Sequence, residues 1–357
     1  MDTYTAQPSN SSDNPLEEPK QYSDVVRFTA LIIGIPIIMV GFFGNALTIA
    51  AVIKTKSLRT GANIFIIGLS TFDLTYTCVV VPTVITVHWR NSWVFSKIYC
   101  HIFPVVFILA VGESLMSLSG TAVCRYLKIM RPKIFALIFS RKCYVAALLC
   151  GFWLTPVLCI MPPIVGIWGQ LGYEPRTLTC TFLRDDSGYN TFLMLTAFMT
   201  PITFISFCYL RILCKVCANH RKIQAARQTS TSGDQSVQKS QQREDLRYTR
   251  MMVAIFVVFL MAYTPYIVNN LLDPYVENMD RGFFCATCAW LSPCLNPVIY
   301  ALLNRHFRRA FLTILPCCNP DTVEESVHKS AWWGENQHLL CNGLVQTTKV
   351  SQKIEKL

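Results

Sequence analysis

Long apolar segments, separated by short polar ones, are the dominant pattern along this chain. A helix of about 20 apolar residues crosses the hydrocarbon core of a bilayer, and each of these segments is long enough to do so. Several contain proline, which is tolerated in a membrane bundle because neighbouring helices and waters satisfy the freed carbonyls. The pattern predicts an all-α membrane protein, a seven-transmembrane helix bundle over 26–303 with spans at 26–53, 62–87, 98–126, 143–167, 190–214, 249–272 and 283–303.

Composition and charge support a multi-pass protein of the plasma membrane. Hydrophobic residues make up 52% of the chain and charged residues 15%, against about a quarter charged in soluble domains. The net charge of +11 comes largely from alternate connections, which are therefore expected in the cytoplasm, so nucleic acid is not needed as a partner. The N-terminal tail, 1–25, is then extracellular, and Asn10 in it begins an N-glycosylation acceptor triplet. The outer connections hold few basic residues, namely Arg90, Lys97, Arg176, Arg184 and Arg281.

The residues after the last span predict a second type of membrane contact. In 304–316, apolar residues repeat at helical spacing opposite arginines, which is typical of a short amphipathic eighth helix lying in the membrane interface. The cytoplasmic tail, 317–357, begins with Cys317 and Cys318. These two residues are either palmitoylation sites or ordinary thiols. The apolar and basic positions of the helix are Phe307, Phe311 and Leu315 against Arg305, Arg308 and Arg309.

Single residues inside the spans form an ordered set. The motifs run in this order: Gly44-Asn45, Leu69 to Asp73, Cys124-Arg125-Tyr126 followed by Pro132, Trp153 with Pro156, Pro201 with Tyr209, Pro265, and Asn296-Pro297-Val298-Ile299-Tyr300. Any one of these strings can occur by chance, but the set with one motif per span is specific. Over about 26–318 the chain resembles the rhodopsin-like G-protein-coupled receptors.

The resemblance implies a receptor rather than an enzyme. Such a receptor transduces a small extracellular ligand to a heterotrimeric G protein, with arrestin and a receptor kinase as partners at the C-terminal tail and membrane lipids around the bundle. Within the family, Arg247 to Met252 and Asn296 to Phe307 make the chain similar to the moody and trapped-in-endoderm type of orphan receptor and, more loosely, to melatonin receptors.

Asp73 is the deepest charge in the predicted bundle. A carboxylate facing lipid is unfavourable, so Asp73 is expected to point into the interior. The resemblance implies a polar core that could hold an allosteric sodium ion, while no other cofactor or metal is implied. A protonated, hydrogen-bonded structural aspartate is the alternative. Glu113, in the third span next to Ser114, faces either the fourth span or the cavity. The implied core residues are Asn45, Asp73, Ser114, Ser292 and Asn296.

Arg125 is the second charge that needs an explanation. It either extends to the cytoplasmic surface or waits inside the bundle for a partner. Members of the family usually carry an acid immediately before this arginine, and here that residue is Cys124. We therefore expect Arg125 to pair with Asp245 in the inactive state and to lose that pair on activation. The implied switch residues are Cys124, Arg125, Tyr126, Tyr209, Asp245, Tyr263, Pro265, Pro297 and Tyr300.

The resemblance also implies a disulfide between Cys100 and Cys180, on the oxidising side of the membrane. It would hold the second outer loop over the cavity, with Trp93 packed against it. Two free thiols are the alternative.

The outer halves of the spans predict an aromatic, largely uncharged cavity. Phe107 stands where amine receptors of the family have an aspartate, and 286–292 contains no lysine for a retinal Schiff base. A monoamine receptor and an opsin are therefore disfavoured, and a neutral, lipid-like or small aromatic ligand is expected. Each aromatic side chain is equally open to a role in ordinary helix packing. The expected lining is His88, Phe103, Phe107, Val111, Phe198, Tyr263, Tyr266, Asn269, Asn270 and Trp290.

Two other classes of membrane protein remain as alternatives. An intramembrane enzyme needs paired catalytic aspartates, a Ser–His pair or a zinc motif in its spans, and none is present in the sequence. A secondary transporter usually has internally repeated spans, whereas these seven do not repeat.

Overall fold

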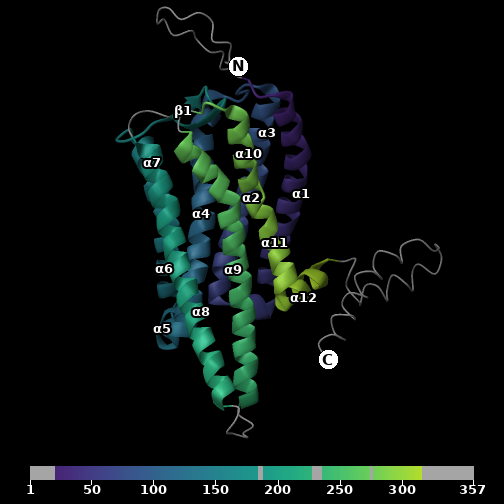
Figure 1. Ribbon diagram of the computed structural model, residues 1–357, viewed down its shortest axis with the longest axis vertical. Helices are drawn as coiled ribbons and strands as arrows, with labels where there is room; N and C mark the ends of the chain where they lie inside the picture. The colour runs from purple at the N-terminus through teal and green to yellow at the C-terminus, as the bar shows by residue number, and fades with distance from the viewer. Residues whose placement is uncertain (1–20, 184–187, 227–234, 274–275, 316–357) are drawn as a thin grey trace, which may run out of the picture.

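The computed structural model describes residues 21–183, 188–226, 235–273 and 276–315. Within those residues, seven helical spans are long and apolar enough to cross a membrane, and they lie alongside one another in one elongated bundle (Figure 1). The spans in chain order are α1 (Asp24–Lys54); α2 (Ile64–Thr75), η3 (Tyr76–Val80) and α3 (Val81–Arg90); α4 (Lys97–Met130); α6 (Lys142–Ile164); α7 (Tyr189–Met194), η4 (Leu195–Met199) and α8 (Thr200–Ala226); α9 (Gln235–Leu272); and α10 (Met279–Trp290) with α11 (Ser292–Leu303).

The seven predicted spans are confirmed, and most of their ends differ by a few residues. The large differences are in two helices: α8 continues to Ala226 rather than 214, and α9 begins at Gln235 rather than 249. Hydropathy marks only the part of a helix that contacts lipid, whereas glutamine, lysine and arginine propagate a helix well in water. Three short helices in the connections were not predicted, namely α5 (Pro132–Ser140), η1 (Lys56–Leu58) and η2 (Gly61–Asn63).

Two spans contain a π-helical turn that apolar patterning does not reveal. The turn η3 ends two residues before Pro82, and η4 ends two residues before Pro201. Proline has no N–H and its ring crowds the carbonyl four residues earlier, so a wider turn accommodates it. The seventh span is also interrupted, at Leu291, just before Pro293. These irregular turns lie beside the sites described below.

A β-hairpin covers one end of the bundle, which we call the hairpin end. Its strands β1 (Leu171–Glu174) and β2 (Thr179–Phe182) pair antiparallel. The disulfide between Cys100 and Cys180 ties β2 to the first turn of α4, which confirms the predicted bridge. Trp93 is buried and stacks on Tyr99, beside Cys100, with a centroid distance of 5.8 Å. The hairpin is thus fixed to the bundle core.

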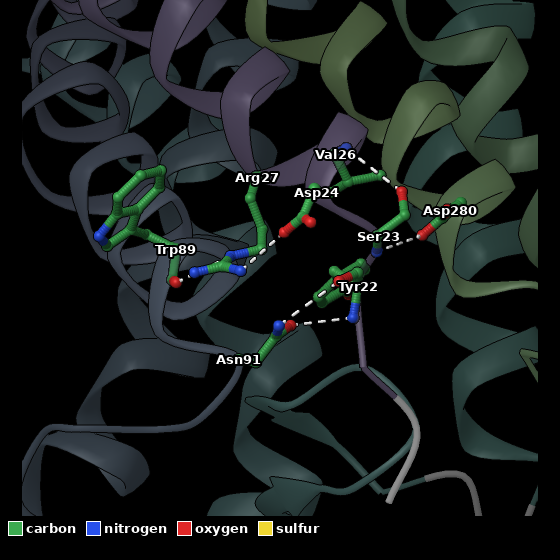
Figure 2. Close-up of polar contacts among 8 residues, drawn as sticks. All are labelled: Tyr22, Ser23, Asp24, Val26, Arg27, Trp89, Asn91 and Asp280. Carbon is green, nitrogen blue, oxygen red and sulfur yellow. Dashed lines mark hydrogen bonds and ion pairs between the residues drawn. The ribbon is translucent and has the colours of Figure 1, made fainter.

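The residues before α1 cross the same end of the bundle (Figure 2). The Tyr22 amide donates to Asn91 Oδ1 over 2.9 Å, and the Tyr22 hydroxyl donates to the Thr177 carbonyl over 3.1 Å. Ser23 caps α1, and its own amide donates to Asp280 Oδ1 over 3.4 Å. Burial, followed by the nearby Asp280 carboxylate, raises the pKa of Tyr22 above its ordinary value, so its hydroxyl remains a donor. We call Tyr22 and Ser23 the strap. The strap joins α1 to the end of α3, to the hairpin and to α10.

The opposite end of the bundle, which we call the α12 end, carries a short helix. Helix α12 (Arg305–Ile314) lies within the predicted 304–316 stretch, and Asn304 caps its start, since the Asn304 side chain accepts from the His306 amide over 2.9 Å. Phe307 is fully buried and stacks on Tyr300, with centroids 5.0 Å apart. The apolar face of α12 is therefore turned largely toward α1 and α11, where it closes this end of the core.

Candidate functional site

A polar core lies in the middle of the bundle, where α2, α4 and α11 meet. Asp73 from α2 is buried, with 3% of its surface exposed. The Ser114 hydroxyl from α4 donates to Asp73 Oδ1 over 3.0 Å, and the Asn296 amide from α11 donates to Asp73 Oδ2 over 2.7 Å. Three of the five residues assigned to the predicted core are therefore joined through the Asp73 carboxylate, and each comes from a different span. The carboxylate faces the interior of the bundle rather than lipid.

Asn45 links α1 to this core through backbone groups. Its amide donates to the carbonyls of Gly41 and Pro293, each over 2.9 Å. A Cβ at Gly44 would lie 2.8 Å from the Pro297 ring, so glycine is what allows α1 and α11 to approach this closely. Asn45 Oδ1 is buried and has no hydrogen-bond partner among the described residues. An acceptor oxygen is thus free beside the polar core. The fifth predicted residue, Ser292, is buried at the start of α11.

Arg125 lies inside the α12 end of the bundle and is only 7% exposed. Its guanidinium carbon is 3.2 Å from the centroid of the Tyr248 ring on α9. The Tyr248 hydroxyl donates to Asn63 Oδ1 over 2.7 Å. We call these three residues, Arg125, Tyr248 and Asn63, the arginine latch, because they join α4, α9 and the start of α2. The side chain of Asp245 lies outside the described residues, so the Arg125–Asp245 pair stays a prediction.

The remaining switch residues lie at several levels of the bundle. Cys124 is buried with Phe65 and Leu149 in a small apolar cluster between α2, α4 and α6, which explains why an uncharged side chain fits there. Tyr300 is fully buried, and its hydroxyl has no hydrogen-bond partner within the described residues. The Tyr126 ring contacts that of Phe207, and the Tyr209 ring contacts that of Phe256. Tyr263 stacks on Phe259 and lies two residues before Pro265, which is inside α9.

An apolar cavity of about 300 Å³ lies between α4, α6, α9 and the fifth span. None of the described residues that line it carries a charge. Polar groups are few, and several of them gather toward the hairpin end at Asn190, Tyr266 and Asn270. Of the ten predicted lining residues, six line this cavity, namely Phe107, Val111, Phe198, Tyr263, Tyr266 and Asn270.

The other four predicted residues pack elsewhere. The His88 ring lies 4.3 Å from the Tyr22 ring and 5.0 Å from that of Phe283, in a cluster that includes Trp290. The remaining two have different partners: Phe103 packs on Trp93, and Asn269 accepts from Arg281. Aromatic character alone did not separate a cavity wall from ordinary packing under the strap.

The cavity has a wall that the sequence reasoning missed. Thr155 and Pro156 on α6 and Thr200 and Pro201 on α8 all line it, as does Phe204. The repeated Thr-Pro pair in spans four and five was a signal available in the sequence, because proline interrupts helix hydrogen bonding at corresponding places in the two helices.

Glu113 does not line the cavity, although it neighbours Ser114 in α4. It is 4% exposed, and its Oε2 has no hydrogen-bond partner within the described residues. Ser117 Oγ and Trp153 Nε1 are also buried without such partners. The carboxyl group therefore belongs to the interior of the helix bundle rather than to the cavity surface.

At the hairpin end, an ion pair fastens α9 to α10. Asp273 Oδ2 lies 2.7 Å from Arg281 Nη2, and Asp273 Oδ1 accepts from the Glu277 amide over 2.8 Å. Burial by itself would raise the pKa of Asp273, but the bonds from the Glu277 amide and from Arg281 outweigh it, so the pKa lies below its ordinary value.

The modification sites predicted at Asn10, Cys317 and Cys318 lie outside the described residues.

Comparisons with known proteins agree with this geometry. The family model described as "7 transmembrane receptor (rhodopsin family)" matches residues 44–300. Trapped in endoderm-1 from Drosophila melanogaster is 30% identical, covering 85% of this chain and 82% of that protein. Melatonin receptor type 1A from Gallus gallus is 30% identical, with 85% and 84% covered. The moody receptor of Drosophila melanogaster is 25% identical over 85% of this chain, which spans about half, 53%, of its length.

The fold has a solved counterpart. A crystal structure of squid rhodopsin superposes with a TM-score of 0.72 at 26% identity, covering 89% of each chain. The resemblance read from single residues is therefore confirmed at the level of both sequence and fold.

Proposed function

The chain belongs to the rhodopsin family of seven-transmembrane receptors, and on that premise we propose that it transmits the binding of a small uncharged ligand to a heterotrimeric G protein. The family is one of receptors rather than enzymes or transporters. We place the hairpin end outside the cell and the α12 end in the cytoplasm. The disulfide at the hairpin end and the basic connections at the other end support this orientation.

The observation that carries the ligand class is the uncharged lining of the cavity. A charged ligand group in this cavity would lose its hydration and find no opposite charge among the described lining residues. Aromatic walls at Phe107, Phe198 and Tyr263 suit an apolar or aromatic body. Hydrogen bonds from Tyr266 and Asn270 would then orient a polar end. A neutral lipid-like or small aromatic molecule fits this chemistry.

One face of α9 connects the cavity to the arginine latch. Tyr263 lines the cavity. Going from Tyr263 toward the α12 end of the helix, apolar or aromatic side chains recur every three or four residues, at Phe259, Phe256, Met252 and Tyr248. Such spacing places all five on one side of a helix, and they are buried or partly buried there. Tyr263 stacks on Phe259 with centroids 4.4 Å apart. A ligand that displaces Tyr263 would therefore bias the position of the whole helix.

The proposed response is an outward movement of the α12 end of α9. That movement separates Tyr248 from Arg125 and opens a crevice for a helix of the G protein. The buried Tyr300 hydroxyl, which has no partner in the described residues, would gain one in the open state together with Tyr209. Arrestin and a receptor kinase are proposed as later partners at 317–357.

We also propose a sodium ion as an allosteric ligand of the polar core. The set contains a carboxylate at Asp73, a hydroxyl at Ser114 and the free amide oxygen of Asn45, which are the hard oxygen ligands that such an ion needs. Ser292 and Asn296 would complete the surroundings. When bound, the ion would supply the positive charge that a buried carboxylate lacks.

The test is a panel of G-protein activation assays on cells that express the receptor, using libraries of neutral lipids and of small uncharged aromatics. At least one uncharged compound should raise activity, and Val111→Trp, which fills the cavity, should remove that response. Ile102→Trp is the matched control, because Ile102 is on the same helix, exposed and outside the cavity. A response restricted to charged compounds, or one that survives Val111→Trp, would contradict the proposed ligand class.

A further inference from the structure

A cluster of aromatic side chains at the hairpin end packs around Tyr22, the first residue of the strap. The centroid of the Tyr22 ring lies 4.3 Å from that of His88 on α3, and His88 lies 5.0 Å from Phe283 on α10. Phe283 in turn meets the Trp290 ring edge-on at 5.8 Å. All four side chains are buried. We call His88, Phe283 and Trp290 the aromatic box, because together they enclose one further ring.

Asn91 binds both backbone groups of Tyr22 (Figure 2). Asn91 Oδ1 accepts from the Tyr22 amide over 2.9 Å, and Asn91 Nδ2 donates to the Tyr22 carbonyl over 3.4 Å. Asn91 ends α3 in the left-handed conformation, with φ of 50°, which asparagine tolerates better than most residues. A side-chain amide that pairs with the amide and the carbonyl of one residue imitates a neighbouring strand. Main-chain pairing of that kind is how many binding sites hold an extended peptide.

Two further bonds read the tyrosine hydroxyl and the residue that follows. The Tyr22 hydroxyl donates to the Thr177 carbonyl of the hairpin over 3.1 Å, a bond that phenylalanine could not make. The Ser23 amide donates to Asp280 Oδ1 at the start of α10 over 3.4 Å. The surroundings therefore match a tyrosine in a peptide chain at its ring, its hydroxyl, its two backbone groups and the next amide.

These contacts form a site separate from the ligand cavity. Tyr22 lies outside any helix or strand, so its position is set by side chains from α3, the hairpin and α10 rather than by a regular backbone ladder. Neither Tyr22 nor any residue of the aromatic box is among the described residues that line the cavity. The strap is thus held at the hairpin end in the manner of a bound peptide.

We propose that the hairpin end is a recognition site for a tyrosine residue within a peptide, and that the receptor's own Tyr22 occupies it. A tyrosine-bearing peptide from outside the cell binds there by displacing the strap. The strap competes strongly, because a tethered residue acts at an effective concentration in the millimolar range. This inference goes beyond the proposed function, since the site lies apart from the ligand cavity and binding to it requires no G protein.

The experiment uses the full-length receptor in nanodiscs and a synthetic peptide with the sequence of residues 18–24, in which photo-leucine replaces the glutamine before the tyrosine. After illumination, mass spectrometry measures labelling of the receptor segments around Asn91 and Asp280. Tyr22→Gly removes the tethered ring and should raise this labelling about tenfold over the wild type. Phe28→Ala is the control, because Phe28 is 56% exposed on α1 and outside the aromatic box, and its labelling should equal that of the wild type.

Peptide and receptor variants then test the recognition itself in the Tyr22→Gly receptor. A peptide with alanine in place of the tyrosine should label no more than the background seen with the wild-type receptor. The phenylalanine peptide should fall between the two, since it keeps the ring and loses the bond to Thr177. Adding Asn91→Ala to the receptor should lower labelling by the tyrosine peptide about tenfold, because both backbone bonds are lost.

A milder variant keeps the test decisive if Tyr22→Gly fails to reach the membrane. Tyr22→Phe retains the ring and loses only the bond to Thr177, so the strap is held less tightly and labelling should exceed that of the wild type. Labelling that stays at the wild-type level in each Tyr22 variant that reaches the membrane would overturn the proposal. Equal labelling by the tyrosine and alanine peptides would do the same.

Discussion

Arg125 illustrates how one buried cation can be held without an acidic neighbour in sequence. Its guanidinium lies on the Tyr248 ring, and a desolvated cation–π contact of this kind contributes about 2 kcal/mol. The hydroxyl of the same tyrosine is bonded to Asn63, which fixes the ring plane. The acid that the family usually carries is replaced by Cys124, so the latch gives α9 a separate hold on this arginine.

Replacing Tyr248 should weaken that hold. We expect Tyr248→Leu to raise ligand-free G-protein activation by roughly 5–30-fold, as a loss of about 1–2 kcal/mol from the closed state implies. Tyr248→Phe, which keeps the ring and loses the bond to Asn63, should have a smaller effect. Nucleotide exchange on purified G protein measures both.

The matched control for this prediction is Tyr144→Leu. Arg141 lies over the Tyr144 ring at 5.9 Å, but that pair is on the exposed side of α6. Basal exchange should stay at the wild-type level in this variant. Equal basal activity in Tyr248→Leu and wild type would show that the latch does not restrain the receptor.

The Asp73 carboxylate gives a second prediction at the scale of a residue. Asp73→Asn removes the charge while keeping the size, so a sodium effect that depends on the carboxylate should disappear. Agonist potency in sodium chloride and in choline chloride should differ for the wild type and coincide for Asp73→Asn. Glu113→Gln, which neutralises a buried carboxyl group on the neighbouring α4, should retain the difference. Its loss in Glu113→Gln alone would move the proposed ion away from Asp73.

Helix α9 is held differently at its two ends, and this suggests which end moves. At the hairpin end, the Asp273–Arg281 pair and the Asn269–Arg281 bond fasten it to α10. At the α12 end, α9 contacts α4 through the arginine latch, in which the Arg125 guanidinium lies on the Tyr248 ring. Pro265 lies inside the continuous helix between these two ends, where it removes one backbone hydrogen bond. A pivot near the hairpin end with displacement at the α12 end follows.

The fastening at Asp273 should be sensitive to acid. Because the pKa of Asp273 is lowered in the folded protein, its stabilising contribution is complete above the ordinary carboxyl value of about 4 and is lost as pH falls through the lowered pKa. We expect thermal stability in detergent to fall in that range for the wild type and to fall less for Asp273→Asn, which is already weaker at neutral pH.

Asp24→Asn provides the comparison for this pH series. The Asp24–Arg27 pair is similarly short, at 2.8 Å, but the Asp24 side chain is 78% exposed, and such surface pairs contribute little. Its stability curve should follow that of the wild type. If Asp273→Asn and Asp24→Asn change the curve equally, the buried clamp has no special role.

At the scale of the whole molecule, the sequence predicted the spans and the interior position of Asp73 correctly, because the bilayer permits few alternatives for either. Runs of apolar residues predict spans, because an unpaired backbone cannot cross hydrocarbon, and Asp73 predicts an interior partner because lipid offers none. Its contacts with Ser114 and Asn296 follow from that constraint. The ordered motifs then identified the family.

Other features depend on packing that no single segment encodes. His88 and Trp290 are aromatic and lie in outer halves of spans, yet Tyr22 and Phe283 fill the space around them. The cavity is instead displaced toward α6 and α8, where η4 and two prolines alter helix geometry. The hairpin strands have four residues each, which is too short for a periodic signal.

The measurement that tests the central claim most directly is the distance between the α12 ends of α4 and α9. Spin-labelled amino acids at Met130 and Arg250 of the full-length receptor report it by double electron–electron resonance. Nucleotide-free heterotrimeric G protein should lengthen this distance by several ångströms, because binding requires Tyr248 to leave Arg125. A complex that forms without any change in the distance, or a receptor that binds no G protein, would contradict the account.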